Sequence, residues 1–135
     1  MNESNPSFDA IGVAGALSRN YASDQAGFVP YIATMLESAL PEHVSVERQP
    51  VRFLSHEKRV SGIEVTLGDV KFSLKADPKH PVACTRTKSV RGIKLKTEDI
   101  SMGEWLDGIA AAITEKAASS EKAYFALKNF LDSTR

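Results

Sequence analysis

Strict alternation of apolar and polar residues indicates β-sheet in the middle of the chain. The clearest case is a hairpin, in which two alternating runs, 63–67 and 70–74, flank the dipeptide Gly68-Asp69. A two-residue turn with glycine first suits a type II′ hairpin. This turn places six apolar residues on one face, and a one-residue slip would scatter them, so the register is well specified. The six are Ile63, Val65, Leu67, Val70, Phe72 and Leu74.

Weaker alternation on both sides of the hairpin predicts further strands. Residues 44–47 alternate, Pro50 interrupts the pattern, and the alternation resumes over 51–53. Residues 82–97 are also strand-like, with Arg91-Gly92 near their middle. That dipeptide is either a tight turn between two strands or a bulge in one long strand, and the pattern leaves both open.

Helical spacing of apolar residues predicts helices in the N-terminal third of the chain. A first helix is expected from Ser7, a candidate N-cap, after a disordered segment 1–6. A second helix has an apolar stripe over residues 28–40, and Pro41 ends it. Pro30 fits best in its first turn, where no backbone N–H is needed.

The last helix has a strong start signal. Ser101 and Glu104 have the spacing of a capping box, and Ile100 can contact Trp105 as a hydrophobic staple. These four residues predict a helix that begins directly after Ser101.

The length of this last helix depends on Ser120, which interrupts an apolar seam that runs over residues 106–131. The helix either continues unbroken to about Leu131 or breaks near Ser119-Ser120 and restarts with a serine cap, and we favour the unbroken form. An unbroken helix would be longer than the sheet is wide. Its aromatic end would then need a cover from the N-terminal helix or from another subunit, and we predict a homodimer. The end comprises Tyr124, Phe125, Phe130 and Leu131.

Together these elements predict a single α+β domain over residues 1–135. We expect two layers, with a four- to five-stranded, mostly antiparallel meander covered on one face by N-terminal helices and a long C-terminal helix. The chain is long enough for one domain and too short for two ordinary ones. Its hydrophobic content of 42% and charged content of 25% are typical of globular proteins.

Charge is segregated along the chain, although the net charge is zero. Residues 1–70 have a net charge of −4, residues 71–96 of +7 and residues 97–135 of −3. Because side chains alternate between the faces of a strand, we expect four lysines on the outer face of the sheet. They are Lys71, Lys75, Lys94 and Lys96, and Arg86, Lys88 and Arg91 are candidates to join them. A solvated face usually mixes signs, so this basic face is the candidate partner-binding surface.

We expect no catalytic, cofactor or metal site. Cys84 lies in a strand without a paired histidine, which favours a small buried side chain over a nucleophile. The three histidines, His43, His56 and His80, lack the spacing of zinc ligands. The chain is therefore expected not to be an enzyme.

The single cysteine excludes an intrachain disulfide and fits a reducing compartment. The N-terminus lacks the basic region of a signal peptide, and the apolar stretch 11–17 is too short to span a bilayer. The expected location is the cytoplasm, and no membrane partner is expected.

Short motifs between residues 35 and 131 resemble a family of small uncharacterised bacterial proteins. They are Leu40-Pro41, Val46-Glu47-Arg48, Leu67-Gly68-Asp69, Val90-Arg91-Gly92-Ile93 and Glu104-Trp105-Leu106, in this order. These motifs form turns and core anchors. The resemblance therefore implies a bacterial origin and no activity, and it assigns no functional residue.

Three classes of function follow from these patterns. The first is a non-enzymatic interaction module, whose basic sheet face binds an acidic protein surface or a second copy of the chain. The second is a nucleic-acid-binding accessory protein, although aromatic residues for base stacking are missing from the outward positions. The third is a small-molecule binder with a pocket between sheet and helix.

Overall fold

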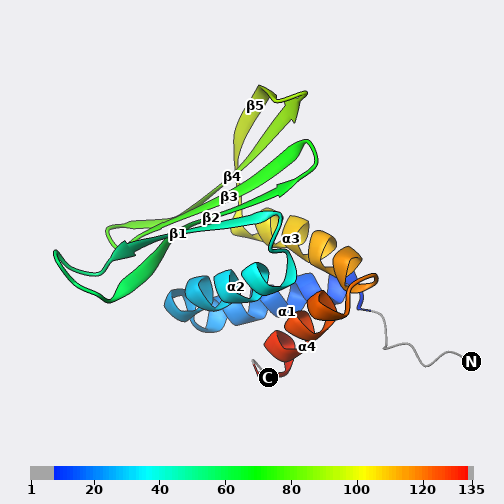
Figure 1. The fold of residues 1–135 in the computed structure, drawn as a ribbon, viewed down its shortest axis with the longest axis horizontal. Helices are drawn as coiled ribbons and strands as arrows, with labels where there is room; N and C mark the ends of the chain where they lie inside the picture. Colours follow the sequence, from blue (N-terminus) through cyan, green and yellow to red (C-terminus); the bar gives the residue numbers. More distant parts are fainter. Residues whose placement is uncertain (1–7, 134–135) are drawn as a thin grey trace, which may run out of the picture.

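The computed structural model describes residues 8–133 of the chain. The segment predicted to be disordered, 1–6, and the candidate cap Ser7 lie outside the described residues. Four helices and five strands follow one another (Figure 1). They are α1 (Ala10–Ser23), α2 (Gln25–Ala39), β1 (Val44–Pro50), β2 (Lys58–Leu67), β3 (Val70–Asp77), β4 (His80–Val90), β5 (Ile93–Ile100), α3 (Met102–Ala117) and α4 (Glu121–Ser133).

The five strands form one antiparallel sheet in sequence order, which confirms the predicted meander and the α+β class. In the β2–β3 hairpin the register is the predicted one, with Val65 opposite Phe72 and Ile63 opposite Leu74. Gly68 has φ 63°, the left-handed value that a type II′ turn needs at its first position. The alternation of side chains therefore specified this hairpin correctly.

Strands β4 and β5 form a second hairpin, which resolves the alternatives left open by the sequence. Arg91 and Gly92 form a tight turn in which both residues have positive φ, 53° and 82°. A two-residue turn of type I′ has this property. The strand pair also contains an irregularity between Lys88 and Ser89, opposite Leu95. Because of this bulge, the side chains at the start of β5 do not continue the inward and outward alternation of the rest of the strand.

The first strand is shorter than predicted, because β1 ends at Pro50 and residues 51–57 form a loop. Proline cannot donate to a sheet ladder, so it ends the pairing here. The predicted resumption of the strand over 51–53 is wrong, and Phe53 is exposed.

Both N-terminal helices are capped by aspartates. The Asp9 carboxylate accepts from the Gly12 N–H at 3.2 Å, and that of Asp24 accepts from the Gly27 N–H at 3.0 Å. Helix α2 therefore starts earlier than predicted, and Pro30 lies inside it rather than in its first turn. The predicted cap for α1 was also wrong, because Asp9 supplies it two residues further along.

The C-terminal segment is two helices. The capping box at Ser101 and Glu104 is confirmed, with the Glu104 N–H donating to Ser101 Oγ at 3.0 Å. The favoured unbroken helix is wrong, because α3 ends at Ala117 and Ser120 Oγ accepts from the Ala123 N–H at 3.2 Å at the start of α4.

This break returns α4 against α2 and covers two of its three aromatic residues within the chain, while Phe125 is 46% exposed. The rings of Phe130 and Tyr31 lie 4.6 Å apart, and Tyr124 and Phe130 are buried. Of the four residues on which a homodimer was predicted, only Phe125 is therefore exposed in the described structure.

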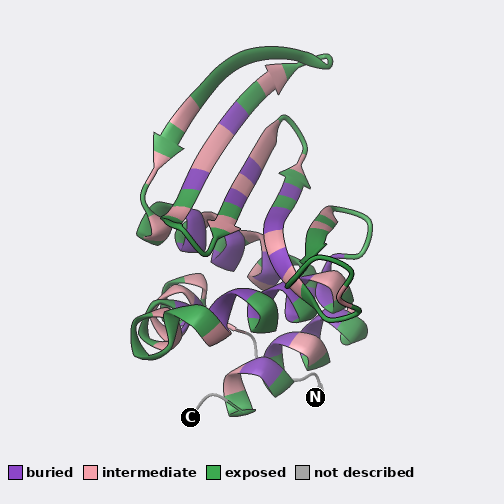
Figure 2. Cartoon of the chain, turned by 90° about the vertical axis from the view of Figure 1, so that its left-hand side faces the viewer, coloured by how far each residue is buried: buried purple, intermediate pink, exposed green. Residues whose placement is uncertain are grey.

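Helices α2 and α3 lie against one face of the sheet, and α1 and α4 pack on those two helices (Figure 1). Buried residues gather between the sheet and the helices (Figure 2). The largest fully buried side chain is that of Trp105, at the start of α3. None of the helices within residues 8–133 is long and apolar enough to cross a membrane.

Candidate functional site: a groove between the sheet and α3

The basic residues of segment 71–96 are divided between the two faces of the sheet. Lys71 is opposite Thr66 and Thr87, and Lys75 is opposite Gly62, all of which alternate with core residues. Lys94 pairs with Ser89 on this same outer face. The outer face therefore has three of the four predicted lysines.

Lys96 lies on the face toward the helices, so its predicted place was wrong. It is opposite Lys88, which in turn is opposite Val70 of the inward apolar set. Strict alternation from Leu95 would have turned Lys96 outward, but Leu95 is the extra residue of a bulge in β5 and shifts the register by one. A bulge of this kind cannot be detected from the alternation of apolar and polar residues.

Arg86 and Lys88 also lie on the inward face rather than joining the outer lysines. Arg86 is opposite Phe72 and lies two residues after the buried Cys84. Arg91 is in the turn between β4 and β5. The structure thus brings Arg86, Lys88 and Lys96 together, away from the outer group.

The outer face mixes charges. Lys71 Nζ lies 3.8 Å from Glu64 Oε2 of the neighbouring strand. Such a pair reduces the field that the three remaining lysines can present to a partner.

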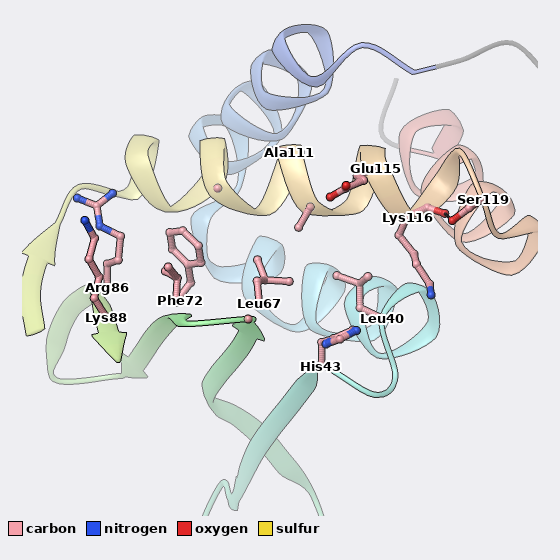
Figure 3. A pocket seen from close by; sticks show the side chains of 14 residues that line it. Leu40, His43, Leu67, Phe72, Arg86, Lys88, Ala111, Glu115, Lys116 and Ser119 are labelled. Carbon is pink, nitrogen blue, oxygen red and sulfur yellow. Dashed lines mark hydrogen bonds between the residues drawn. The ribbon is translucent and has the colours of Figure 1, made fainter. Parts of the chain in front are cut away.

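A groove of about 920 Å³ lies between the inward face and α3 (Figure 3). Apolar side chains from the sheet and from the end of α2 form its floor, and small residues of α3 form its wall. The floor contains Leu40, Leu67, Val70 and Phe72, and the wall contains Gly108, Ala111 and Ala112. Arg86 and Lys88 lie at one end, and His43, Glu115, Lys116 and Ser119 lie toward the other. We call this space the sheet–helix groove.

The groove exists because α3 presents little side-chain volume to this part of the sheet. Only Gly108 approaches closely, since a Cβ built on it would lie 2.5 Å from Cζ of Phe72. Ala111 and Ala112 follow at the next turn of the helix and leave space over Val70 and Leu67. Small residues at this spacing were present in the sequence, but only the position of the helix shows that they border a groove.

One end of the groove has a positive charge excess. Arg86 forms a two-pronged ion pair with Glu98, with Nε 2.9 Å from Oε2, and Lys96 Nζ lies 3.4 Å from Glu98 Oε1. Arg86, and then Lys96, hold the pKa of Glu98 below its usual value. Two cations share this one carboxylate, and Lys88, which lies opposite Lys96 in the sheet, adds a third positive charge beside them. We call Arg86, Lys88, Lys96 and Glu98 the basic end.

Apolar surface continues beyond the basic end onto the β4–β5 hairpin. Val90 and Ile93 form the next pair along the inward face after Lys88 and Lys96. This end of the hairpin extends past the helical layer (Figure 1), and Val90 and Ile93 are 46% and 66% exposed. Exposed apolar residues in continuity with a groove are typical of a surface that binds a partner.

The candidate nucleophile Cys84 and the candidate metal ligands add no reactive group to the groove. Burial raises the pKa of the Cys84 thiol to about 11, and a buried thiol of this kind is unreactive. Within residues 8–133, no group of three or more His, Cys, Asp or Glu side chains is placed to bind a metal ion.

Comparison with protein-family models, with curated proteins and with solved structures gave no match to this chain. The resemblance to a bacterial family therefore stays a prediction, and the function has to be argued from the groove.

Proposed function

We propose that this chain is a non-enzymatic interaction module, which binds an acidic, apolar segment of a partner protein along the sheet–helix groove. The observation that supports it most directly is the placement of Arg86 and Lys88 at the end of an apolar groove of about 920 Å³. The acidic partner predicted from the sequence is kept in this proposal, but its binding surface moves from the outer face to the inner one. The proposed location is the cytoplasm.

The groove dimensions fit a short stretch of polypeptide. From Gly108 to Lys116 the α3 wall is about 12 Å long, at roughly 1.5 Å per residue. An extended chain rises about 3.3 Å per residue, so roughly four residues lie along this wall. Val90 and Ile93 then offer apolar contacts to the residues that follow. A segment with alternating apolar and acidic side chains would place its apolar side on the floor and a carboxylate at the basic end.

Charge supports an acidic partner over a basic one. The basic end has Arg86, Lys88 and Lys96 against Glu98, while Glu115 and Lys116 balance each other at the opposite end. Complementary charge of this kind raises the rate of encounter and fixes the direction in which a partner binds. The acidic end of the partner segment is therefore expected beside β4.

A titration with fluorescent peptides tests this proposal. Two peptides with the same apolar residues are compared, one with glutamate and one with lysine at the alternate positions, and binding is followed by anisotropy. We expect the acidic peptide alone to bind, with an affinity that falls as salt is added. Equal binding of both peptides, or binding of neither, would contradict the proposal.

Matched variants locate the binding site. Ala111→Leu fills the groove from an exposed helix position, and Ala26→Leu makes the same change on the exposed surface of α2. Lys88→Gln removes a charge at the basic end, and Lys75→Gln removes one on the outer face. We expect Ala111→Leu and Lys88→Gln to weaken binding about tenfold, which corresponds to about 1.4 kcal/mol, and the two controls to leave it unchanged.

A small anionic amphiphile is the second candidate, because a volume of about 920 Å³ lies within the range of small-molecule sites, roughly 300–1,000 Å³. Titration with a medium-chain carboxylic acid distinguishes small-molecule binding from peptide binding in the groove. Displacement of the peptide at micromolar acid would favour the small-molecule function. Binding of single-stranded DNA that depends on Lys75 and Lys94, with no peptide binding, would favour the nucleic-acid prediction instead.

A further inference from the structure

The loop between β1 and β2 presents two large apolar side chains to solvent. Phe53 is 91% exposed and Leu54 is 83% exposed. The loop lies at one end of the sheet, beside the β3–β4 turn and beyond the helices (Figure 1). This end is distant in the register from the groove residues Val70 and Lys88, which lie near the opposite turns.

Hydrogen bonds give the loop a defined shape. The Ser55 N–H donates to the Arg52 carbonyl at 2.9 Å, so that residues 52–55 form a β-turn with Phe53 and Leu54 at its two central positions. The Val51 N–H donates to the Glu57 carbonyl at 2.8 Å and closes the base of the loop. Both apolar side chains therefore project from a closed turn.

Leu54 occupies a backbone conformation that favours glycine. Its φ is 64°, the left-handed value that the third residue of a type II turn adopts, where glycine or asparagine is usual. A leucine there is strained and gains nothing from burial, since its side chain is exposed. A strained backbone together with an exposed side chain indicates that Leu54 serves to contact another molecule rather than to stabilise the fold.

Basic residues surround this apolar pair. Arg52 and Lys58 flank the loop, Arg59 Nη1 donates to the Ala76 carbonyl at 3.1 Å, and Lys79 lies in the adjoining turn. Glu57 and Asp77 are the acidic residues of these two segments, and the Asp77 carboxylate accepts from the Lys79 N–H at 2.8 Å. The pKa of Asp77 is lowered by that hydrogen bond first and by His80 second. Four cations thus outnumber two carboxylates.

We propose that Phe53 and Leu54 insert into an anionic lipid surface, while Arg52, Lys58, Arg59 and Lys79 bind its headgroups. Apolar side chains at the boundary between headgroups and acyl chains, with basic residues behind them, are the usual composition of interfacial anchors. A convex apolar tip suits a fluid surface, whereas a specific protein interface needs a broader complementary area. The sequence alone predicted no membrane partner, because neither a signal peptide nor a membrane-spanning segment was found in it.

Flotation with vesicles tests this proposal on the intact chain. The vesicles consist either of phosphatidylcholine alone or of phosphatidylcholine with about one third phosphatidylserine, which supplies the negative surface potential. We expect binding to the anionic vesicles only, reduced at least about fivefold when the salt concentration is raised from low to physiological. Equal binding to both vesicles, or to neither, would overturn the proposal.

The variants separate insertion from folding. Leu54→Gly removes the apolar side chain and relieves the left-handed strain, so the variant should be at least as stable as the wild type and yet bind anionic vesicles at least about fivefold more weakly. Ile11→Ser removes an equally exposed apolar side chain from α1, at 83% exposure, and should leave binding unchanged. Retained binding by Leu54→Gly, or an equal loss with Ile11→Ser, would contradict insertion of the loop.

A tryptophan probe reports the depth of insertion. The native tryptophan, Trp105, is fully buried, so lipids with brominated acyl chains should not quench its fluorescence. In Phe53→Trp, anionic brominated vesicles should quench the added component and shift its emission to the blue. No quenching would overturn the proposal. Peptide binding in the groove should be the same in all loop variants, so this proposal and the proposed function can fail separately.

Discussion

Gly108 of α3 lies against the ring of Phe72 on β3, where both residues line the sheet–helix groove. A Cβ on Gly108 would lie 2.5 Å from Cζ and 2.6 Å from Cε1 of Phe72. Phe72 is buried and has Val65 and Arg86 as its neighbours in the sheet, so its ring has little freedom to move. This pair sets how near the helix lies to the sheet.

The first prediction is that Gly108→Ala destabilises the protein. Alanine normally stabilises a helix relative to glycine by about 1 kcal/mol, but overpacking against Phe72 costs about 1–3 kcal/mol. Denaturant unfolding measures the net change, which should be destabilising. Gly103→Ala is the control on the same helix, because a Cβ there meets only Ser101 Oγ at 3.7 Å. A gain in stability for Gly108→Ala would contradict the close packing.

The second prediction concerns the β2–β3 hairpin. Leu74→Ala should lower the unfolding free energy by about 2–5 kcal/mol, because it leaves a cavity in a fully buried part of the core. Lys75→Ala changes the next residue, which is exposed on the outer face, and should alter stability by less than about 0.5 kcal/mol. Comparable losses for the two variants would contradict the inward register.

The third prediction concerns the caps that separate the two C-terminal helices. Ser120→Ala removes the acceptor for the Ala123 N–H and should cost about 1 kcal/mol, as should Ser101→Ala at the start of α3. Ser119→Ala is the control, since its hydroxyl donates to the Lys116 carbonyl and caps no helix start. Thermal unfolding followed by circular dichroism measures all three. Equal effects of Ser119→Ala and Ser120→Ala would place the break elsewhere.

The β2–β3 hairpin was predictable because two independent signals agreed. The alternation of apolar residues and the Gly68-Asp69 turn each specify the same register, and a slip would move every core residue to the other face. The capping box at Ser101 was predictable for a similar reason, since its hydrogen bonds are local. Structural features whose hydrogen bonds join residues only a few positions apart can be predicted from a single sequence.

The groove was not predictable because it depends on distant contacts. The place of Lys96 depends on a bulge, and the break between α3 and α4 depends on how well α4 packs against α2. The apolar seam continues across Ser120, so periodicity alone favoured one helix. The bulge and the helix break cannot be recognised from the residue composition of their segments. Both affect which charged side chains border the groove.

The fourth prediction follows from the proposed function and concerns Glu98. This carboxylate neutralises part of the basic end through Arg86 and Lys96. Glu98→Gln should therefore tighten binding of the acidic peptide, by about threefold to tenfold at low salt and by less at physiological salt. Glu64→Gln removes the carboxylate paired with Lys71 on the outer face and should have no effect. Weaker peptide binding by Glu98→Gln would show that the ion pair positions Arg86 for its partner.

The fifth prediction is a pH dependence of stability that originates at Cys84. Burial raises the pKa of its thiol from 9.0 to about 11, so the folded chain keeps a proton that the unfolded chain releases. This contribution to stability is therefore fully present below pH 9 and is lost as the pH rises through about 11. Over that window, the unfolding free energy of the wild type should fall relative to that of Cys84→Ala by up to about 1.4 kcal/mol per pH unit. The other groups of the chain are the same in both proteins and cancel in the difference. Denaturant unfolding at several pH values between 8 and 11 measures it, and two parallel profiles would show that the thiol is not desolvated in the folded sheet.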